Sequence, residues 1–92
     1  MMKYYVYVLF SIKDKKLYVG YTQDIQKRFF EHAQGKAPST CHRLPLKLIY
    51  YEVYTNSVEA RRREMYLKGG NGRAQLKKQL YLTLKKLGYR HL

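Results

Sequence analysis

The strongest constraint on the fold is an alternating run of tyrosine and valine near the start of the chain, from Lys3 to Ser11. Aromatic and β-branched side chains favour strands, because they pack well on a pleated sheet. A polar stretch, 12–16, separates this run from a second short one, 17–21, so the two are predicted to form an antiparallel hairpin. Alternate residues point to opposite faces of a strand. Val6 would therefore lie on an aliphatic face, and Tyr7 on a face that carries hydroxyl groups.

A helix is predicted after the hairpin, with Asp24 or Thr22 as its N-cap and Gly35 at its end. The segment that follows, 35–44, is polar and is bracketed by the two prolines of the chain, so it is predicted to be a mobile loop. The residues of the helix that recur every four positions, and that are expected to face the core, are Ile25, Phe29 and Ala33.

The second half of the chain supplies one more strand and two more helices. Residues 46–54 are almost continuously apolar, which predicts a central strand covered on both faces. Asn56 fits the N-cap of a helix that runs to Lys68, and Asn71 could cap a third helix that ends at Gly88. We therefore predict an α/β fold of the α+β type, a three-stranded antiparallel sheet flanked by helices in the order β-β-α-β-α-α. The apolar seam of the third helix would consist of Leu76, Leu80, Leu84 and Leu87.

The charge of the chain restricts its partners. Lys and Arg number 19 and Asp and Glu number 6, so the formal net charge is +13 in 92 residues. Such an excess attracts phosphate polymers, because binding releases their condensed counterions. The single cysteine, Cys41, excludes an intrachain disulfide, and the longest apolar stretch, 4–10, is too short to cross a bilayer. We expect one domain, spanning residues 1–92, in a cytoplasmic protein that does not bind membranes.

Two tyrosine triplets in the predicted hairpin resemble those of a known family. Tyr5-Val6-Tyr7 and Tyr18-Val19-Gly20 are followed by Arg28 and His32 in the first helix and by Glu64 in the second. Together these motifs are similar to those of the GIY-YIG nuclease superfamily, and in particular of its small, stand-alone bacterial members. The first triplet departs from Gly-Ile-Tyr but keeps the final tyrosine, and the resemblance covers nearly the whole chain.

The resemblance implies hydrolysis of phosphodiester bonds with one divalent ion, Mg²⁺ or Mn²⁺. Tyr7 and Tyr18 match the tyrosines that activate and position the attacking water. Arg28 matches the arginine that binds the scissile phosphate, and His32 lies where relatives carry a tyrosine or histidine near that phosphate. Glu64 matches the single glutamate that binds the metal.

The acidic residues are too few for a site with two metal ions, which needs several convergent carboxylates. Among the six in the chain, Glu31 is predicted to point away from Arg28, and Glu64 remains after the others are assigned to turns, caps and a strand. One carboxylate suits a single hydrated Mg²⁺ ion. A tyrosine with its ordinary pKa of about 10 is an inefficient base at neutral pH, unless cations such as Arg28 and the metal lower that pKa.

The remaining basic residues are expected to form a groove that contacts the nucleic-acid backbone without distinguishing bases. DNA is favoured over RNA as the ligand. The residues assigned to this contact are Gly20, Tyr21, Lys36, Arg43, Arg61, Arg62, Lys68 and Arg73.

Other interpretations stay open from the sequence. The tyrosines could be ordinary cross-strand aromatics, His32 a solvated helix histidine, and Glu64 the i, i+4 partner of Lys68 on a wet helix face. The chain would then be a non-catalytic basic module that binds DNA or RNA. Docking on an acidic protein, such as a repair or recombination partner, is a third and weaker interpretation.

Overall fold

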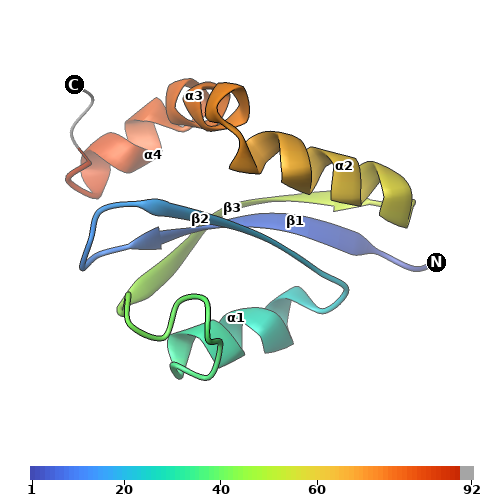
Figure 1. Cartoon of the computed structure of the whole chain (residues 1–92), viewed down its shortest axis with the longest axis horizontal. Helices are drawn as coiled ribbons and strands as arrows, with labels where there is room; N and C mark the ends of the chain where they lie inside the picture. The colour runs from blue at the N-terminus through green and yellow to red at the C-terminus, as the bar shows by residue number, and fades with distance from the viewer. Residues whose placement is uncertain (90–92) are drawn as a thin grey trace.

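The computed structural model describes residues 1–89. A three-stranded sheet lies between helices on its two faces (Figure 1). Helix α1 covers one face, and helices α2, α3 and α4 cover the other (Figure 1). The elements are, in chain order, β1 Tyr4–Ser11, β2 Leu17–Thr22, α1 Ile25–Ala33, β3 Leu46–Tyr54, α2 Ser57–Lys68, α3 Gly70–Gln79 and α4 Tyr81–Lys86. The predicted α+β fold with an antiparallel sheet is confirmed.

The strands pair in the order β2-β1-β3, and both pairings are antiparallel. β1 is the central strand, and its residues 6–10 are all buried. The prediction that 46–54 forms the central strand is wrong, because β3 is an edge strand on which Tyr51 and Val53 stay about half exposed. Apolar side chains show that the faces of a strand can be covered, but they carry no information on whether both of its hydrogen-bonding edges are paired.

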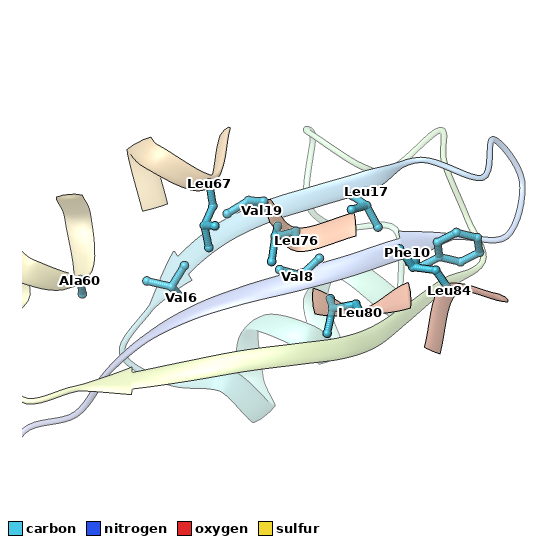
Figure 2. Packing of buried hydrophobic residues seen from close by; sticks show 10 residues of the cluster. All are labelled: Val6, Val8, Phe10, Leu17, Val19, Ala60, Leu67, Leu76, Leu80 and Leu84. Carbon is cyan, nitrogen blue, oxygen red and sulfur yellow. The ribbon is translucent and has the colours of Figure 1, made fainter. Parts of the chain in front are cut away.

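The alternation predicted for β1 divides the buried residues into two clusters. On the face covered by α2, α3 and α4 the side chains are aliphatic or aromatic hydrocarbons (Figure 2). On the α1 face the buried cluster contains the Tyr7 hydroxyl beside Leu9 and Leu46. The first cluster comprises Val6, Val8, Phe10, Leu17, Val19, Ala60, Leu67, Leu76, Leu80 and Leu84.

Helix α1 begins at Asp24, whose Oδ1 accepts a hydrogen bond from the Lys27 backbone at 3.1 Å. Its buried residue is His32, whereas Ala33, expected in the core, is exposed. A strict spacing of four drifts around the helix by about 40° at each step, because one turn takes about 3.6 residues. The inward stripe that starts at Ile25 and Phe29 therefore continues to His32 rather than to Ala33.

The helices on the other face begin and end partly as expected. Asn56 caps α2 by accepting hydrogen bonds from the backbone of Val58 and Glu59. The third predicted helix is interrupted at Leu80, so it forms two helices, α3 and α4, and its N-cap is Gly69 rather than Asn71. Its leucine seam faces the sheet as predicted. Within residues 1–89, none of the helices combines the length and the apolar character that crossing a bilayer requires.

Candidate active site

Tyr7 lies across its cross-strand partner Gly20. A Cβ atom at Gly20 would overlap the ring and the hydroxyl group of Tyr7, so only glycine leaves room for the ring at this position. The Tyr7 side chain is almost fully buried, at 2% exposure. Its hydroxyl group thereby reaches over β2, which is an outer strand of the sheet.

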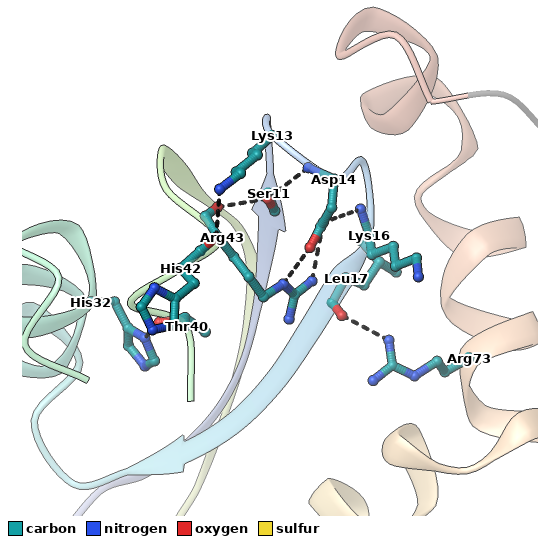
Figure 3. Close-up of polar contacts among 10 residues, drawn as sticks. All are labelled: Ser11, Lys13, Asp14, Lys16, Leu17, His32, Thr40, His42, Arg43 and Arg73. Carbon is teal, nitrogen blue, oxygen red and sulfur yellow. Dashed lines mark hydrogen bonds and ion pairs between the residues drawn. The ribbon is translucent and has the colours of Figure 1, made fainter. Parts of the chain in front are cut away.

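Two short contacts link Tyr7 to helix α1 and to the loop that follows it. The Tyr7 hydroxyl lies 2.9 Å from His32 Nε2, and His32 Nδ1 lies 2.6 Å from Thr40 Oγ1. All three side chains are buried, and Figure 3 shows His32 and Thr40 side by side. Burial, helped by the nearby charge of Arg28, lowers the pKa of His32 to about 4. His32 is therefore neutral at pH 7 and is not the solvated histidine of the open alternative.

Tyr18 completes an aromatic cluster with these residues. The centroid of its ring lies 5.2 Å from that of His32 and 6.4 Å from that of Tyr7. Its hydroxyl group accepts a hydrogen bond from Ser39 Oγ at 3.2 Å. The two tyrosines that close and open the triplets thus meet on the α1 face, beside one histidine.

The loop between α1 and β3 holds this cluster in place. Segment 35–44 was predicted to be mobile, but Ala37 and Thr40 are buried, and Ser39 and Thr40 contact Tyr18 and His32. Sequence reasoning missed both positioning residues. A polar segment bracketed by prolines is typical of a surface loop, and no pattern within it marks which hydroxyl group turns inward.

Arg28 stands beside the Tyr7 phenol, with its side chain about one-third exposed. Burial raises the pKa of Tyr7 to about 12, and Arg28 offsets that rise only in part. Nη1 of Arg28 also pairs with Glu31 Oε1 at 3.1 Å. The prediction that Glu31 points away from Arg28 is wrong, because residues three apart share one face of a helix.

Glu64 faces the sheet rather than solvent. It lies on one stripe of α2 with Ala60 and Leu67, and all three residues are buried. Its carboxylate pairs with Lys68 Nζ at 2.9 Å and with Arg61 Nη1 at 3.5 Å. The i, i+4 pair of the open alternative is therefore present, but the carboxylate in it is sheltered.

Glu64 and Tyr7 belong to opposite faces of the sheet, since α2 covers one face and α1 covers the other (Figure 1). The negative charge of Glu64 is one of the smaller contributions to the raised pKa of Tyr7, after burial. Helix α2 packs along β2, and the guanidinium carbon of Arg61 lies 3.8 Å from the centre of the Tyr21 ring.

The donor set around Glu64 fits one hard metal ion. Among residues 1–89, no three side chains of the ligating types His, Cys, Asp and Glu gather into a group that could hold a metal. A metal at Glu64 would take one protein carboxylate and complete its coordination with water and substrate oxygens, as Mg²⁺ commonly does. Both present partners of Glu64, Arg61 and Lys68, are more exposed than its carboxylate.

The predicted backbone-contacting residues divide into two groups. The first lies around β2 and the helices beside it. Arg61 covers Tyr21, Arg62 is exposed, and Lys36 Nζ lies 6.0 Å from the centre of the Phe30 ring. The second group, Arg43 and Arg73, lies at the end of the hairpin (Figure 3).

The structure is thus a small α+β domain with a tyrosine-rich hairpin, a partly exposed arginine beside the Tyr7 phenol and a sheltered glutamate on α2. A family model described as the GIY-YIG catalytic domain matches residues 3–79. The chain belongs to the GIY-YIG family, which is a family of nucleases and implies a nucleic-acid substrate.

Its relatives include small proteins named UPF0213. The chain is 45% identical over 74 residues to the UPF0213 protein SpyM50708 of Streptococcus pyogenes serotype M5, and the match covers 79% of each chain. The UPF0213 protein SpyM3_1077 of serotype M3 matches to the same extent. The solution NMR structure of the UPF0213 protein BH0048 from Bacillus halodurans is 36% identical, covers 85% of both chains and has a TM-score of 0.54.

Proposed function

We propose that the protein is an endonuclease that hydrolyses phosphodiester bonds in DNA with the help of one Mg²⁺ or Mn²⁺ ion. The observation that carries this proposal is the gathering of Tyr7, Tyr18, Arg28 and His32 on the α1 face of the sheet, with the charge of Glu64 acting on the Tyr7 phenol. Tyr7, Tyr18 and His32 can accept or move a proton, Arg28 can bind a phosphoryl oxygen, and Glu64 can ligate a hard metal ion. These are the requirements of phosphodiester hydrolysis.

Tyr7 and His32 move the proton of the attacking water. At neutral pH the phenol is protonated and the imidazole is neutral, since their pKa values are about 12 and about 4. We assign the tautomer in which the phenol donates to His32 Nε2 over 2.9 Å and Nδ1–H donates to Thr40 Oγ1 over 2.6 Å. As water attacks phosphorus and the bond from phosphorus to the leaving oxygen breaks, the water proton passes to the Tyr7 oxygen while the Tyr7 proton passes to Nε2. The leaving alkoxide takes a proton from solvent water, and the imidazolium, disfavoured by burial, returns its proton through Tyr7 to solvent.

Arg28, Tyr18 and Glu64 bind the phosphate and stabilise its developing charge, directly or through the metal ion. Arg28 presents a guanidinium group that never loses its charge at working pH and that can hold two phosphoryl oxygens at once. Tyr18, oriented by Ser39, donates its hydroxyl proton to the water or to a phosphoryl oxygen. Glu64 would hold the divalent ion, which when bound supplies a Lewis acid for the developing negative charge.

The test is cleavage of supercoiled plasmid DNA, with an RNA of matched length as the second substrate. Wild type is expected to nick DNA with Mg²⁺ or Mn²⁺ and to stop in EDTA. Glu64→Ala is expected to abolish nicking, while Glu59→Ala, an exposed carboxylate in the same helix, is expected to cut normally. If wild type cuts neither polymer, or if Glu64→Ala cuts as well as wild type, the proposal is wrong. Faster cleavage of RNA would overturn the DNA preference alone.

A non-catalytic module that binds nucleic acid is the second candidate. The observation in its favour is that Lys68 and Arg61 already neutralise the Glu64 carboxylate. In that case no form of the protein cuts, and Glu64→Ala and Tyr7→Phe bind as wild type does. Binding should weaken steeply with salt, since each contact with a duplex phosphate contributes about 0.9 to the log–log slope. Binding that salt leaves unchanged would contradict both candidates.

A further inference from the structure

A hollow of about 770 Å³ lies where the β1–β2 turn, the loop before β3 and helix α3 meet. None of the candidate catalytic residues lines it. Figure 3 shows part of its wall, with Arg43 and Asp14 at the turn and Arg73 reaching toward the start of β2. Its charged lining residues are Asp14, Lys15, Lys16, Arg43, Arg73 and Lys77.

The charge of this hollow is strongly positive. Five of the six charged residues are basic, and the one carboxylate, Asp14, is engaged by Arg43 through contacts of 2.6 and 3.3 Å. That contact holds the pKa of Asp14 at about 2, so the carboxylate stays paired with Arg43 at neutral pH. Within residues 1–89, no carboxylate pairs with the ammonium group of Lys16 or of Lys77. The hollow therefore presents cations that lack a counter-charge of their own.

Two of these cations are held in position before any ligand arrives. Arg73 donates from Nη1 to the carbonyl oxygen of Leu17 at 2.9 Å, which fixes one edge of its guanidinium group and leaves other N–H groups for a ligand (Figure 3). Arg43 is held by Asp14 in the same way. A fixed planar guanidinium group loses little conformational entropy on binding, and its geometry matches phosphate oxygens.

The hollow and the candidate active site share strand β2. Leu17 lines the hollow, and the next residue, Tyr18, belongs to the aromatic cluster, with the two side chains on opposite faces of the strand. Neighbouring residues of a strand are about 3.3 Å apart along it. A nucleic-acid backbone that follows the outer edge of β2 past Tyr18 would therefore come to Leu17, whose carbonyl oxygen holds Arg73.

We propose that this hollow is a second phosphate-binding site, which holds a backbone phosphate of the same nucleic-acid strand whose scissile phosphate lies at Tyr7 and Arg28. The inference rests on the proposed nucleic-acid substrate, but not on catalysis. It assigns Lys16 and Lys77 to substrate binding beside Arg43 and Arg73. It also gives the protein a contact that sets where along the strand the scissile bond is placed.

The test compares two double variants that remove the same charge. Lys16→Gln/Lys77→Gln empties the hollow of two cations, and Lys3→Gln/Lys78→Gln removes two exposed lysines that do not line it. Anisotropy of a fluorescein-labelled duplex in EDTA reports binding without cleavage. We expect at least a tenfold loss of affinity for the first variant and less than threefold for the control. The log–log salt slope of the first variant should become shallower by about 0.9, for the one phosphate that the hollow no longer neutralises.

Chemical shifts and kinetics separate this inference from the proposed function. On titration with the duplex, the NMR chemical shifts of the backbone amides of Leu17 and Arg73 should change, both in wild type and in Lys3→Gln/Lys78→Gln. Under cleavage conditions the hollow variant should raise KM at least tenfold with kcat within a factor of two. If the protein binds but never cuts and the hollow variant binds weakly, the nuclease proposal fails and the hollow stands. If both double variants bind equally, or if no form binds nucleic acid, the hollow proposal is wrong.

Discussion

The two faces of the sheet bury different kinds of side chain. The face under α2, α3 and α4 buries hydrocarbon side chains and one carboxylate, that of Glu64, whereas the face under α1 buries Tyr7, His32 and Thr40 in one hydrogen-bonded chain. Buried polar groups contribute to stability only when every partner is in place, and they hold reactive groups in fixed geometry. The comparison teaches that one face supplies most of the packing free energy, and the other supplies a rigid arrangement of titratable groups.

The largest effect that we expect is a loss of cleavage activity, without a loss of stability, from a substitution on the α1 face. Arg28→Ala should slow cleavage by about 10³-fold, or about 4 kcal/mol in the barrier, because a charged donor to the phosphate is removed. Its side chain is partly exposed, so the free energy of unfolding should change little. Nicking rates and urea unfolding measure the two quantities. Lys27→Ala, an exposed neighbour in the same helix, is the control, and equal losses in both variants would refute the assignment.

The opposite result is expected on the other face. Leu76→Ala should lower the free energy of unfolding by about 3 kcal/mol, because Leu76 is fully buried in the hydrocarbon cluster and its truncation leaves a cavity. The protein that remains folded should cut at the wild-type rate. Leu82→Ala, at 73% exposure, should leave the unfolding midpoint unchanged. A large change in kcat for Leu76→Ala would show that the two faces are not separate.

Two contributions to the pH dependence of stability should arise on the α1 face. Between pH 6.5 and about 4 the unfolded chain protonates His32 and the folded chain does not, so the free energy of unfolding falls as pH falls. Above pH 10 the unfolded chain loses the Tyr7 proton, which the folded chain keeps to about pH 12, so stability also falls as pH rises. Each group contributes up to about 3 kcal/mol.

Urea unfolding across this pH range gives the measurement. The acid slope between pH 6.5 and 4 should shrink in His32→Gln, and the alkaline slope should shrink in Tyr7→Phe. His42→Gln removes an exposed histidine and should leave the wild-type profile intact. Leu76→Ala should lower the whole curve without altering its shape. An acid slope that survives in His32→Gln would place its origin elsewhere.

The smallest change in structure, and the finest test of the comparison, is the addition of one methyl group. Gly20→Ala places a Cβ against the Tyr7 ring, and forcing the ring aside should cost about 2 kcal/mol. Displacement of the phenol from His32 should also slow cleavage by tenfold or more. Gly70→Ala, where a Cβ meets no atom within 4 Å, is the matched control. Normal activity in Gly20→Ala would show that the position of the phenol is not critical.

Local patterns predicted a large part of the fold. The hairpin and the N-caps at Asp24 and Asn56 follow from residue types and spacing over a few residues. Of the five candidate catalytic residues, the structure brings Tyr7, Tyr18, Arg28 and His32 together on the α1 face and places Glu64 on α2, and their catalytic roles stay predictions. Prediction was weaker where partners are distant in sequence. The Arg73 contact with Leu17 joins positions 56 residues apart, and no local pattern announces it.

The sequence by itself determined which residues share a face. The twofold alternation of β1 sends Val6 and Tyr7 to opposite sides whatever the strand pairs with, since this is a property of the strand alone. Tertiary structure decided the strand order: β3 pairs with the second edge of β1, so that β2 stays at the outside of the sheet. Tertiary contacts also place Thr40 of the α1–β3 loop within hydrogen-bonding distance of His32. Strand order and loop packing depend on contacts between distant segments, whose free energy is set by the whole core and not by any single stretch of residues.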